Sequence, residues 1–274
     1  MNIGEIIQSK YGSFTKKQHQ IADYLLSRPA EICYITLADL SKKIGCSELT
    51  ILKFCRTIGV NNFLELKEAF RQYNHVLADT FSASTISLPI KSADNSDTQF
   101  LKQCCEEEMA SISRFYSQID FKKIDLIAKN LMGRRTIYLF AHDVSKTFAT
   151  FLLERLKIMR LHAVLVDLAE MAQLEKVFHS INKKDAAVLF SFPKYFFAIE
   201  EIARNIQEKT GEVVLFTDNP ENPATDCTDE IIYCETHTPI FNNSWILPVV
   251  AINLLTNGMA LNLSRGYASL PDEM

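Results

Sequence analysis

Residues 138–146 read YLFAHDVSK, and this stretch predicts a buried strand that runs directly into the start of a helix. The apolar run Tyr138-Leu139-Phe140 is followed by a polar turn, after which an apolar helical segment, TFATFLLERL, begins at Thr147. In α/β proteins such a corner commonly binds a phosphate through glycines and a helix N-terminus. This corner contains no glycine, so whether it binds a ligand is the first question that the sequence raises.

The chain around this corner alternates between apolar strands and amphipathic helices from about residue 99 onward. Strands are predicted at 136–141, 163–168, 186–192, 212–218 and 230–235. Helices are predicted at 98–118, 121–132, 146–159, 172–181, 196–209 and 243–263. Because this alternation is typical of a parallel sheet with helices on both faces, residues 99–274 are expected to form an α/β domain with a five-stranded parallel sheet.

Residues 1–75 contain helical patterns only. Helices are expected at 13–29, 36–44, 47–58 and 62–74, and glycines follow the second and third of them. Residues 76–98 are rich in Ser, Thr, Asp and Ala, which predicts a linker. The expected fold class is therefore an all-helical N-terminal domain (1–75), a linker (76–98) and a C-terminal α/β domain (99–274).

The composition is that of a soluble globular protein. The 274 residues are 47% hydrophobic and 23% charged. The longest apolar stretch, at 245–263, is interrupted by Pro248 and Gly258, so no membrane span and no membrane partner are expected. The N-terminus lacks the apolar core of a signal peptide, which favours a cytoplasmic location.

The seven cysteines predict reduced thiols and no metal site. None of them forms a C-x-x-C motif, and no histidine lies at zinc-ligand spacing from a cysteine pair. Cys33 and Cys55 stand among apolar residues, where buried thiols are common. No cofactor and no metal ligand are therefore predicted.

The charge is unevenly divided between the two parts of the chain. Residues 1–75 hold ten Lys and Arg against seven Asp and Glu, a net charge of +3. The remaining residues hold 19 against 26, a net charge of −7. A basic module on an acidic body favours nucleic-acid binding by the first part.

The segments 36–44 and 47–58 have the spacing of a helix-turn-helix. A tight turn at Gly45-Cys46 joins them, and the second helix has one apolar stripe. Its exposed face is predicted to contact DNA through Ser47, Glu48, Thr50, Lys53 and Arg56. Ser47 is suited to capping the helix or meeting a phosphate, Glu48 to accepting from cytosine, and the two cations to guanine edges or phosphates. A helical hairpin inside a core, with solvated charges, is the alternative.

The first domain resembles the N-terminal domain of RpiR-type transcriptional regulators. The resemblance rests on the IADYLL helix, the LADLS helix, the run SELTILKFCRTIG and the following NFLELK. Lys53 stands where an arginine is common in that family, and lysine lacks the bidentate fork of arginine. Residues 134–156, 183–192 and 211–233 similarly resemble the SIS (sugar isomerase) domain that these regulators carry. The resemblance implies a domain that dimerises and binds a phosphorylated sugar, which modulates operator binding.

The two ligand loops depart from the pattern of the SIS family. The first loop, usually G-x-G-x-S, is Ala141-His142-Asp143-Val144-Ser145 here, and the second, usually S-x-S-G-x-T, is residues 191–196. Side chains at the glycine positions crowd an anion's approach to backbone N–H groups. Asp143 is expected to cap the following helix with its own carboxylate and to repel a phosphate. Pro193 removes one N–H donor, and Tyr195 and Phe196 add bulk.

Three interpretations of these loops stay open. Cationic side chains bind a sugar phosphate in place of backbone groups, a different and uncharged ligand binds, or the domain binds no small ligand and serves for dimerisation. The candidate ligand-binding residues are His142, Ser145, Lys146, Ser191 and Lys194. For the two serines, the alternatives to ligand contact are a helix cap at Ser145 and a strand-end hydroxyl at Ser191.

The sequence favours a DNA-binding transcriptional regulator that is not an enzyme. We expect a homodimer or homotetramer that binds a palindromic operator in double-stranded DNA, with a sugar phosphate as the effector that the resemblance implies. One alternative is a sugar-phosphate isomerase or related lyase, which needs a general base beside the loops. Glu170, Glu175, His162 and His179 are the candidates for that base. A protein-interaction module with a vestigial DNA-binding part is the other alternative.

Overall fold

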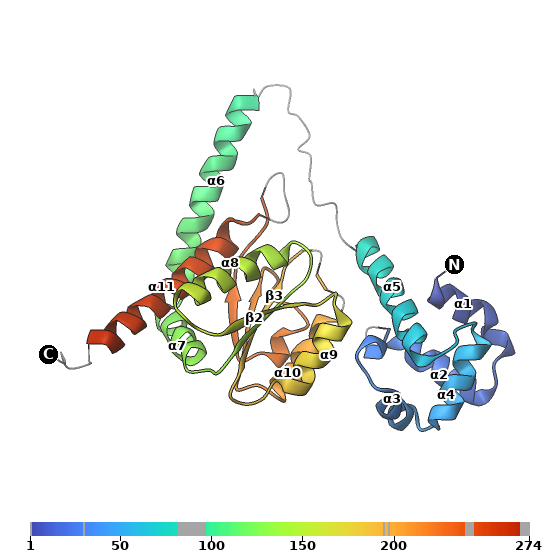
Figure 1. The fold of residues 1–274 in the computed structure, drawn as a ribbon. Coiled ribbons are helices and arrows are strands. Elements are labelled where there is room, and N and C mark those ends of the chain that lie inside the picture. The colour runs from blue at the N-terminus through green and yellow to red at the C-terminus, as the bar shows by residue number, and fades with distance from the viewer. Residues whose placement is uncertain are drawn as a thin grey trace. The chain divides into compact units, whose positions relative to one another are not determined.

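The computed structural model describes residues 2–29, 31–81, 97–193, 195–196, 198–238 and 244–268. The chain divides into two compact units, residues 1–82 and residues 83–274 (Figure 1). The first unit is helical. The second unit contains the sheet.

The described residues of the helical unit form five α-helices and two short 3-10 turns. The α-helices are α1 (Ile3–Lys10), α2 (Lys16–Ser27), α3 (Leu37–Ile44), α4 (Glu48–Thr57) and α5 (Phe63–Phe81). The turns are η1 (Tyr11–Ser13) and η2 (Glu31–Cys33). The expected helix-turn-helix corresponds to α3 and α4.

Polar side chains define where these helices begin. The Thr15 side chain accepts from the backbone N–H of Gln18, whose own side chain accepts from the Thr15 N–H. Thr36 and Ser47 cap α3 and α4 by their side chains alone, accepting from the N–H groups of Asp39 and Thr50. Such caps satisfy N–H groups that the helix leaves unpaired, which is why the sequence predicts these starts well.

Gly45 makes the turn between α3 and α4 possible. Its φ of 71° is in the left-handed region, and the N–H groups of Gly45 and Cys46 both donate to the carbonyl of Ser41, at 3.0 and 3.1 Å. The two helices then pack on a common core, to which α4 contributes Ile51, Phe54 and Cys55, all fully buried. Glycine is favoured at this position because side chains rarely adopt that conformation.

Gly45→Ala should destabilise the helical unit by about 1–2 kcal/mol, the cost of a left-handed conformation for a residue with a Cβ. A Cβ at Gly45 would meet no heavy atom within 4 Å, so the backbone and not a clash is the cause. Gly12→Ala is the matched control, because Gly12 has equally open space and no positive φ. Chemical denaturation of both variants measures the difference, and equal stabilities would contradict this account of the turn.

The second unit is built on a five-stranded parallel sheet. The strands are β1 (Ile137–Ala141), β2 (Ala163–Asp167), β3 (Ala186–Ser191), β4 (Glu212–Thr217) and β5 (Glu230–Tyr233). They are ordered β2-β1-β3-β4-β5, and every neighbouring pair is parallel. Leu139 of β1, for example, lies between Leu165 of β2 and Val188 of β3. The predicted α/β class and strand number are confirmed.

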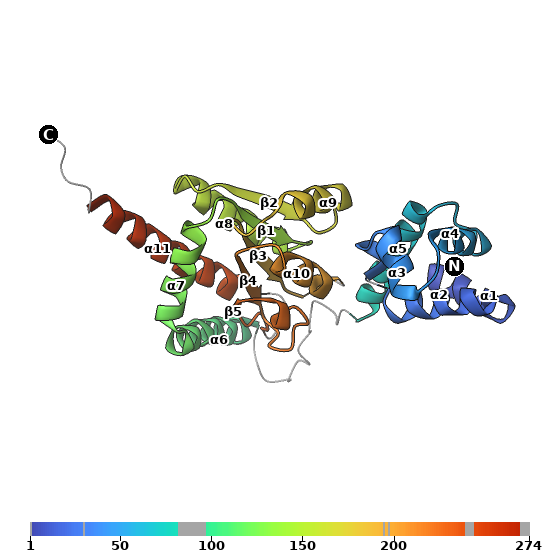
Figure 2. The same cartoon turned by 90° about the horizontal axis from the view of Figure 1, so that it is seen from below.

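Helices cover both faces of this sheet, as Figures 1 and 2 show. The helices of this unit are α6 (Asp97–Gln118), α7 (Phe121–Met132), α8 (Ser145–Ile158), α9 (Met171–Ser180), α10 (Ile199–Gln207) and α11 (Ile246–Ala268), and η3 (Thr225–Cys227) is a 3-10 turn. Helices α7, α8 and α11 enclose the main core with the strands. Helix α9 contacts β2, and α10 contacts β3 and β4.

Helix α11 differs from its prediction. Its stretch Ile246–Arg265 is long and apolar enough to cross a membrane by length and composition, although the sequence suggested that Pro248 and Gly258 interrupt it. Pro248 lies in the first helical turn, where a missing N–H costs little. One side of α11 packs into the core of the unit through Ala251, Ile252 and Leu255, which are fully buried.

The boundaries of the predicted linker also differ. Helix α5 continues to Phe81 and α6 begins at Asp97, so both ends of the range 76–98 are helical. Residues 75–81 lack Pro and Gly, which leaves nothing in the sequence to stop α5 at residue 75. Residues 82–96 lie outside the described residues.

Candidate nucleic-acid interface and ligand loops

The outer face of α4 carries two positively charged side chains that form no ion pair with another described residue. Lys53 and Arg56 are exposed and lie opposite the buried side of the helix, which includes Ile51 and Phe54. Lys43 of α3 forms an ion pair with Glu31, whereas neither Lys53 nor Arg56 forms an ion pair with another described residue. Two exposed cations on a second helix, without an ion-pair partner among the described residues, are suited to base edges or phosphates.

Neighbouring segments fix the position of α4. Lys10 donates from Nζ to the carbonyl of Thr57 at 2.8 Å, and Gln18 of α2 donates from Nε2 to the Thr57 hydroxyl at 3.0 Å. Lys17 donates to the carbonyl of Gly45 at 3.4 Å. These bonds connect the C-terminal end of α4, and the turn that precedes the helix, to α1 and α2.

Two polar side chains at the start of α4 form hydrogen bonds within the helix. Ser47 caps the helix, and its hydroxyl lies 2.8 Å from the hydroxyl of Thr50. Of the two roles considered for Ser47, the cap is the one that this conformation uses. Glu48 is exposed and Thr50 is half-buried. DNA contact by these five residues stays a prediction.

The sheet topology brings the two candidate ligand loops together. After β1 the chain forms β2 on one side of β1, and it then crosses over to form β3 on the other side of β1. The strand order therefore reverses between β1 and β3. The carboxyl ends of two strands at such a reversal form the usual ligand crevice of open α/β sheets. His142 and Ser145 follow β1, and Ser191 ends β3, so these three candidates share one edge of the sheet. Lys194 lies outside the described residues.

The backbone of Asp143 has a left-handed conformation, which favours glycine, and the Asp143 side chain does not cap the helix that follows. Its φ is 46°, in the left-handed region, which aspartate tolerates better than most residues. Helix α8 begins at Ser145, its N-cap position is Val144, and no side chain accepts from the helix there. The expected carboxylate cap is therefore wrong. Backbone carbonyls take its place, since the N–H of Ser145 donates to His142 at 3.0 Å and that of Lys146 to Asp143 at 3.1 Å.

Lys146 is paired with an acidic side chain of the neighbouring strand. Its Nζ donates to Oδ2 of Asp167, the last residue of β2, at 2.8 Å. This hydrogen bond raises the pKa of Lys146. Partial burial favours a higher pKa for Asp167, but the bonds from Lys146 and from the N–H of Ala169 outweigh it and lower that pKa. An anionic ligand would have to draw Lys146 away from this carboxylate.

Ser191 belongs to a buried polar cluster. Its hydroxyl accepts from Nδ2 of Asn222 at 2.8 Å, and the same nitrogen lies 3.2 Å from the hydroxyl of Thr217. The side chain of Asn222 also accepts from the N–H of Ala224 at 3.0 Å. All three polar residues are at most 2% exposed. No local pattern in the sequence predicts this role of Asn222, which lies 31 residues from Ser191.

Aromatic side chains fill the region around the second loop. Phe192 is buried with its ring 5.2 Å from that of Phe148 of α8, and Phe196 is buried 4.8 Å from the ring of His142. Tyr195 donates from its hydroxyl to Oδ1 of Asp218 at 2.7 Å. The loops after β3 and β4 are thereby tied together, and apolar groups stand where the SIS family pattern has small polar residues.

The candidate catalytic bases are dispersed. His162 precedes β2, and its Nδ1 lies 3.2 Å from the hydroxyl of Thr136, which precedes β1, so it stands at the amino end of the sheet. His179 contacts the carbonyl of Glu175 within α9, at 2.6 Å. Glu170 is exposed at the start of α9. Of the four, Glu170 alone lies near the carboxyl ends of the strands.

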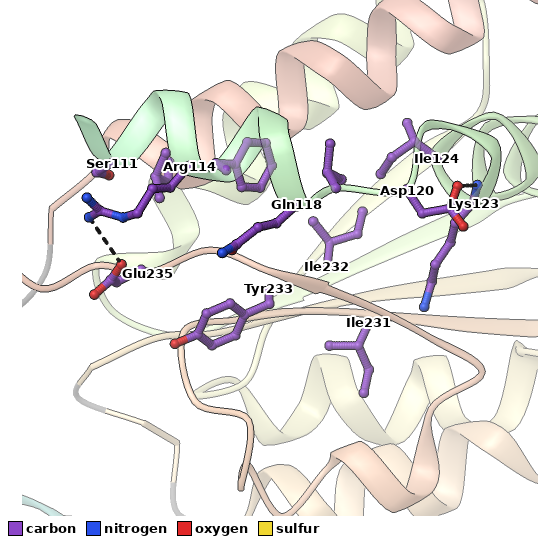
Figure 3. Close-up of a pocket in the computed structure, with 13 residues that line it drawn as sticks. Ser111, Arg114, Gln118, Asp120, Lys123, Ile124, Ile231, Ile232, Tyr233 and Glu235 are labelled. Atoms are coloured by element: carbon purple, nitrogen blue, oxygen red, sulfur yellow. Dashed lines mark hydrogen bonds and ion pairs between the residues drawn. The ribbon is translucent and has the colours of Figure 1, made fainter. Parts of the chain in front are cut away.

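A separate cavity of about 380 Å³ lies at the other edge of the sheet, between α6, α7 and β5 (Figure 3). Its charged side chains are paired, Arg114 with Glu235 at 3.9 Å and Lys123 with Glu230 at 2.7 Å. Asp120 caps α7 by accepting from the N–H groups of the next turn. None of the described candidates among the ligand-loop residues, which are His142, Ser145, Lys146 and Ser191, lines this cavity.

Comparison with known families assigns both units. The helix-turn-helix domain of the rpiR family matches residues 1–75, and the SIS domain matches residues 130–258. The first match contains α4 with Lys53 and Arg56, and the second contains both candidate ligand loops.

Several curated relatives are named as regulators. The regulator HexR of Pseudomonas aeruginosa is 22% identical over 263 residues, which cover 95% of this chain and 90% of HexR. An uncharacterized regulator of Thermotoga maritima is 23% identical over 97% of this chain and 93% of its own length. A Haemophilus influenzae regulator is 29% identical over 140 residues, which span about half of either protein.

Solved structures share the fold. The Vibrio vulnificus NanR protein, complexed with ManNAc-6P, aligns over 96% of this chain and 93% of its own with a TM-score of 0.52 at 16% identity. The sugar isomerase domain of an RpiR transcription factor from Sphaerobacter thermophilus aligns over 62% of this chain and 95% of its own with a TM-score of 0.56 at 15% identity. With an rpiR-type helix-turn-helix domain joined to a SIS domain, the chain belongs to the RpiR-type transcriptional regulators.

Proposed function

We propose that this regulator binds a palindromic operator as a dimer or tetramer, with one α4 in the major groove of each half-site. The observation that carries the proposal is the pair Lys53 and Arg56, exposed and without an ion-pair partner among the described residues. Two-fold symmetric helix-turn-helix proteins read half-sites about one helical turn apart. The SIS domains supply the dimer contact in this proposal, the protein acts in the cytoplasm, and it has no catalytic role.

Selection from a random-sequence duplex pool by the full-length chain tests this function. We expect enrichment of one inverted-repeat sequence. Affinity for that duplex should fall steeply with salt, because Lys and Arg release counterions from the phosphates. Sedimentation of the complex should give two copies, or four, for each duplex. A pool without enrichment, or a non-repeated enriched site bound by one copy, would contradict the proposal.

A sugar-phosphate effector is the second part of the proposal, and the observation that favours it is Lys146 at the carboxyl end of the sheet. Lys146 lies on the first turn of α8, beside the loop that matches the first SIS ligand loop. Its partner Asp167 is half-buried at the end of the neighbouring strand. Binding of a phosphate there requires exchange of one anion for another, which predicts weak affinity in the native chain.

Asp167→Asn should strengthen the binding of a sugar phosphate, because it removes the competing charge while an amide oxygen can still accept from the N–H of Ala169. A thermal-shift panel of sugar phosphates and free sugars measures this. Ligand at about 100 times its dissociation constant stabilises by roughly 2.7 kcal/mol, which raises the melting temperature by several degrees. We expect a larger shift in Asp167→Asn than in the native chain, and none in Lys146→Ala.

Two results would contradict the effector proposal. A shift that persists in Lys146→Ala places the ligand elsewhere, with the cavity beside β5 as the next site to examine. A flat panel for the native chain and for Asp167→Asn indicates that the aromatic residues of the second loop have closed the site. The domain then serves for assembly alone.

A further inference from the structure

Helix α4 presents a mixed stripe of one apolar and two cationic side chains. Leu49, Lys53 and Arg56 follow one another at intervals of four and three residues, which places them on one side of the helix. The side chains on the opposite side, among them Ile51 and Phe54, are fully buried. Leu49 is 61% exposed, so it belongs to the outer face and not to the core.

Its position distinguishes Leu49 from an ordinary exposed leucine. A single exposed apolar residue on a protein surface needs no explanation. Leu49, however, is the second residue of α4 and stands at the N-terminal end of the stripe. In a helix-turn-helix the N-terminal residues of the second helix contact base edges. The hydroxyls of Ser47 and Thr50 bond to each other, which leaves Glu48 and Leu49 as the other exposed side chains of this turn.

The chemistry of the major groove then defines what Leu49 meets. Each base pair presents hydrogen-bond donors and acceptors there, and the C5-methyl group of thymine is the apolar group on these edges. We propose that Leu49 contacts the C5-methyl of a thymine in each operator half-site and thereby helps to determine the sequence that the protein reads. This inference rests on the proposed operator binding.

Replacement of thymine by deoxyuridine removes this methyl group alone and leaves base pairing unchanged. The probe is the duplex enriched from the random pool by the full-length chain, synthesised with deoxyuridine at one thymine position of each half-site at a time. At one such position, deoxyuridine in one half-site should lower the affinity of the native chain about fourfold, and deoxyuridine in both half-sites about fifteenfold. The reason is that the burial of one methyl-sized group is lost in each half-site. Leu49→Ala should bind the thymine and deoxyuridine duplexes equally well.

Leu64→Ala is the matched control, because Leu64 is 74% exposed on α5 and not on α4. It should keep the full preference for thymine. Equal binding of all deoxyuridine duplexes by the native chain overturns the inference and leaves operator binding intact. The same thymine preference in Leu49→Ala also overturns it. A random pool without any enriched sequence overturns both operator binding and this inference.

Discussion

The variant with Lys53→Ala and Arg56→Ala together should lose specific operator binding while it remains folded. Both side chains are exposed and neither forms an ion pair within the described part of the unit, so their removal breaks no ion pair among the described residues. A base contact by such a residue contributes about 1–3 kcal/mol. Two lost contacts therefore cost about 2–6 kcal/mol per half-site, at least roughly thirtyfold in affinity.

Fluorescence anisotropy with the selected duplex measures this loss. Lys122→Ala with Lys176→Ala is the matched control, since it removes the same charge from exposed positions of the other unit. The control should keep most of its affinity, and both double variants should melt at the native temperature. Unchanged affinity in the α4 variant would show that the protein reads DNA with another surface.

Phe54→Ala should unfold or severely weaken the helical unit. Phe54 is fully buried, and its ring packs edge-on against that of Phe14, with 5.3 Å between centroids. Truncation of a buried phenylalanine costs about 3–5 kcal/mol, a large part of the stability of a small domain. Hydrogen exchange of the amides in α4 should accelerate by a few hundredfold or more, and operator binding should fall with it.

The α/β unit provides the internal reference for this variant. Its core does not include Phe54, so exchange in β3 and β4 should stay at the native rate. Leu64→Ala, exposed on α5, should change stability by no more than about 0.5 kcal/mol. Native exchange rates in α4 of Phe54→Ala would contradict the core described for this unit.

Signals confined to a few residues predicted much of the fold. Thr15, Thr36 and Ser47 mark helix starts because each satisfies N–H groups two or three positions ahead, and Gly45 marks a turn because of its own backbone freedom. The strands were recognisable as short apolar runs between helices. Their order in the sheet was not, since it depends on which faces pack together.

Contacts between distant residues account for what the sequence did not predict. The bonds of Lys146 to Asp167 and of Asn222 to Ser191 join residues 21 and 31 positions apart, and no local pattern indicates them. Leu49 differs from these two bonds, because local spacing alone is enough to predict its exposure. Its spacing of four and seven residues from Lys53 and Arg56 was a readable sign of the exposed face.

Methylation interference on the selected duplex tests the central claim most directly. Dimethyl sulfate modifies guanine at N7, which lies in the major groove, and adenine at N3, which lies in the minor groove. If α4 reads DNA through Lys53 and Arg56, methylation of guanine N7 at one or more positions in each half-site should block binding of the full-length chain. Interference from adenine N3 alone, or from no base at all, would contradict major-groove recognition by this helix.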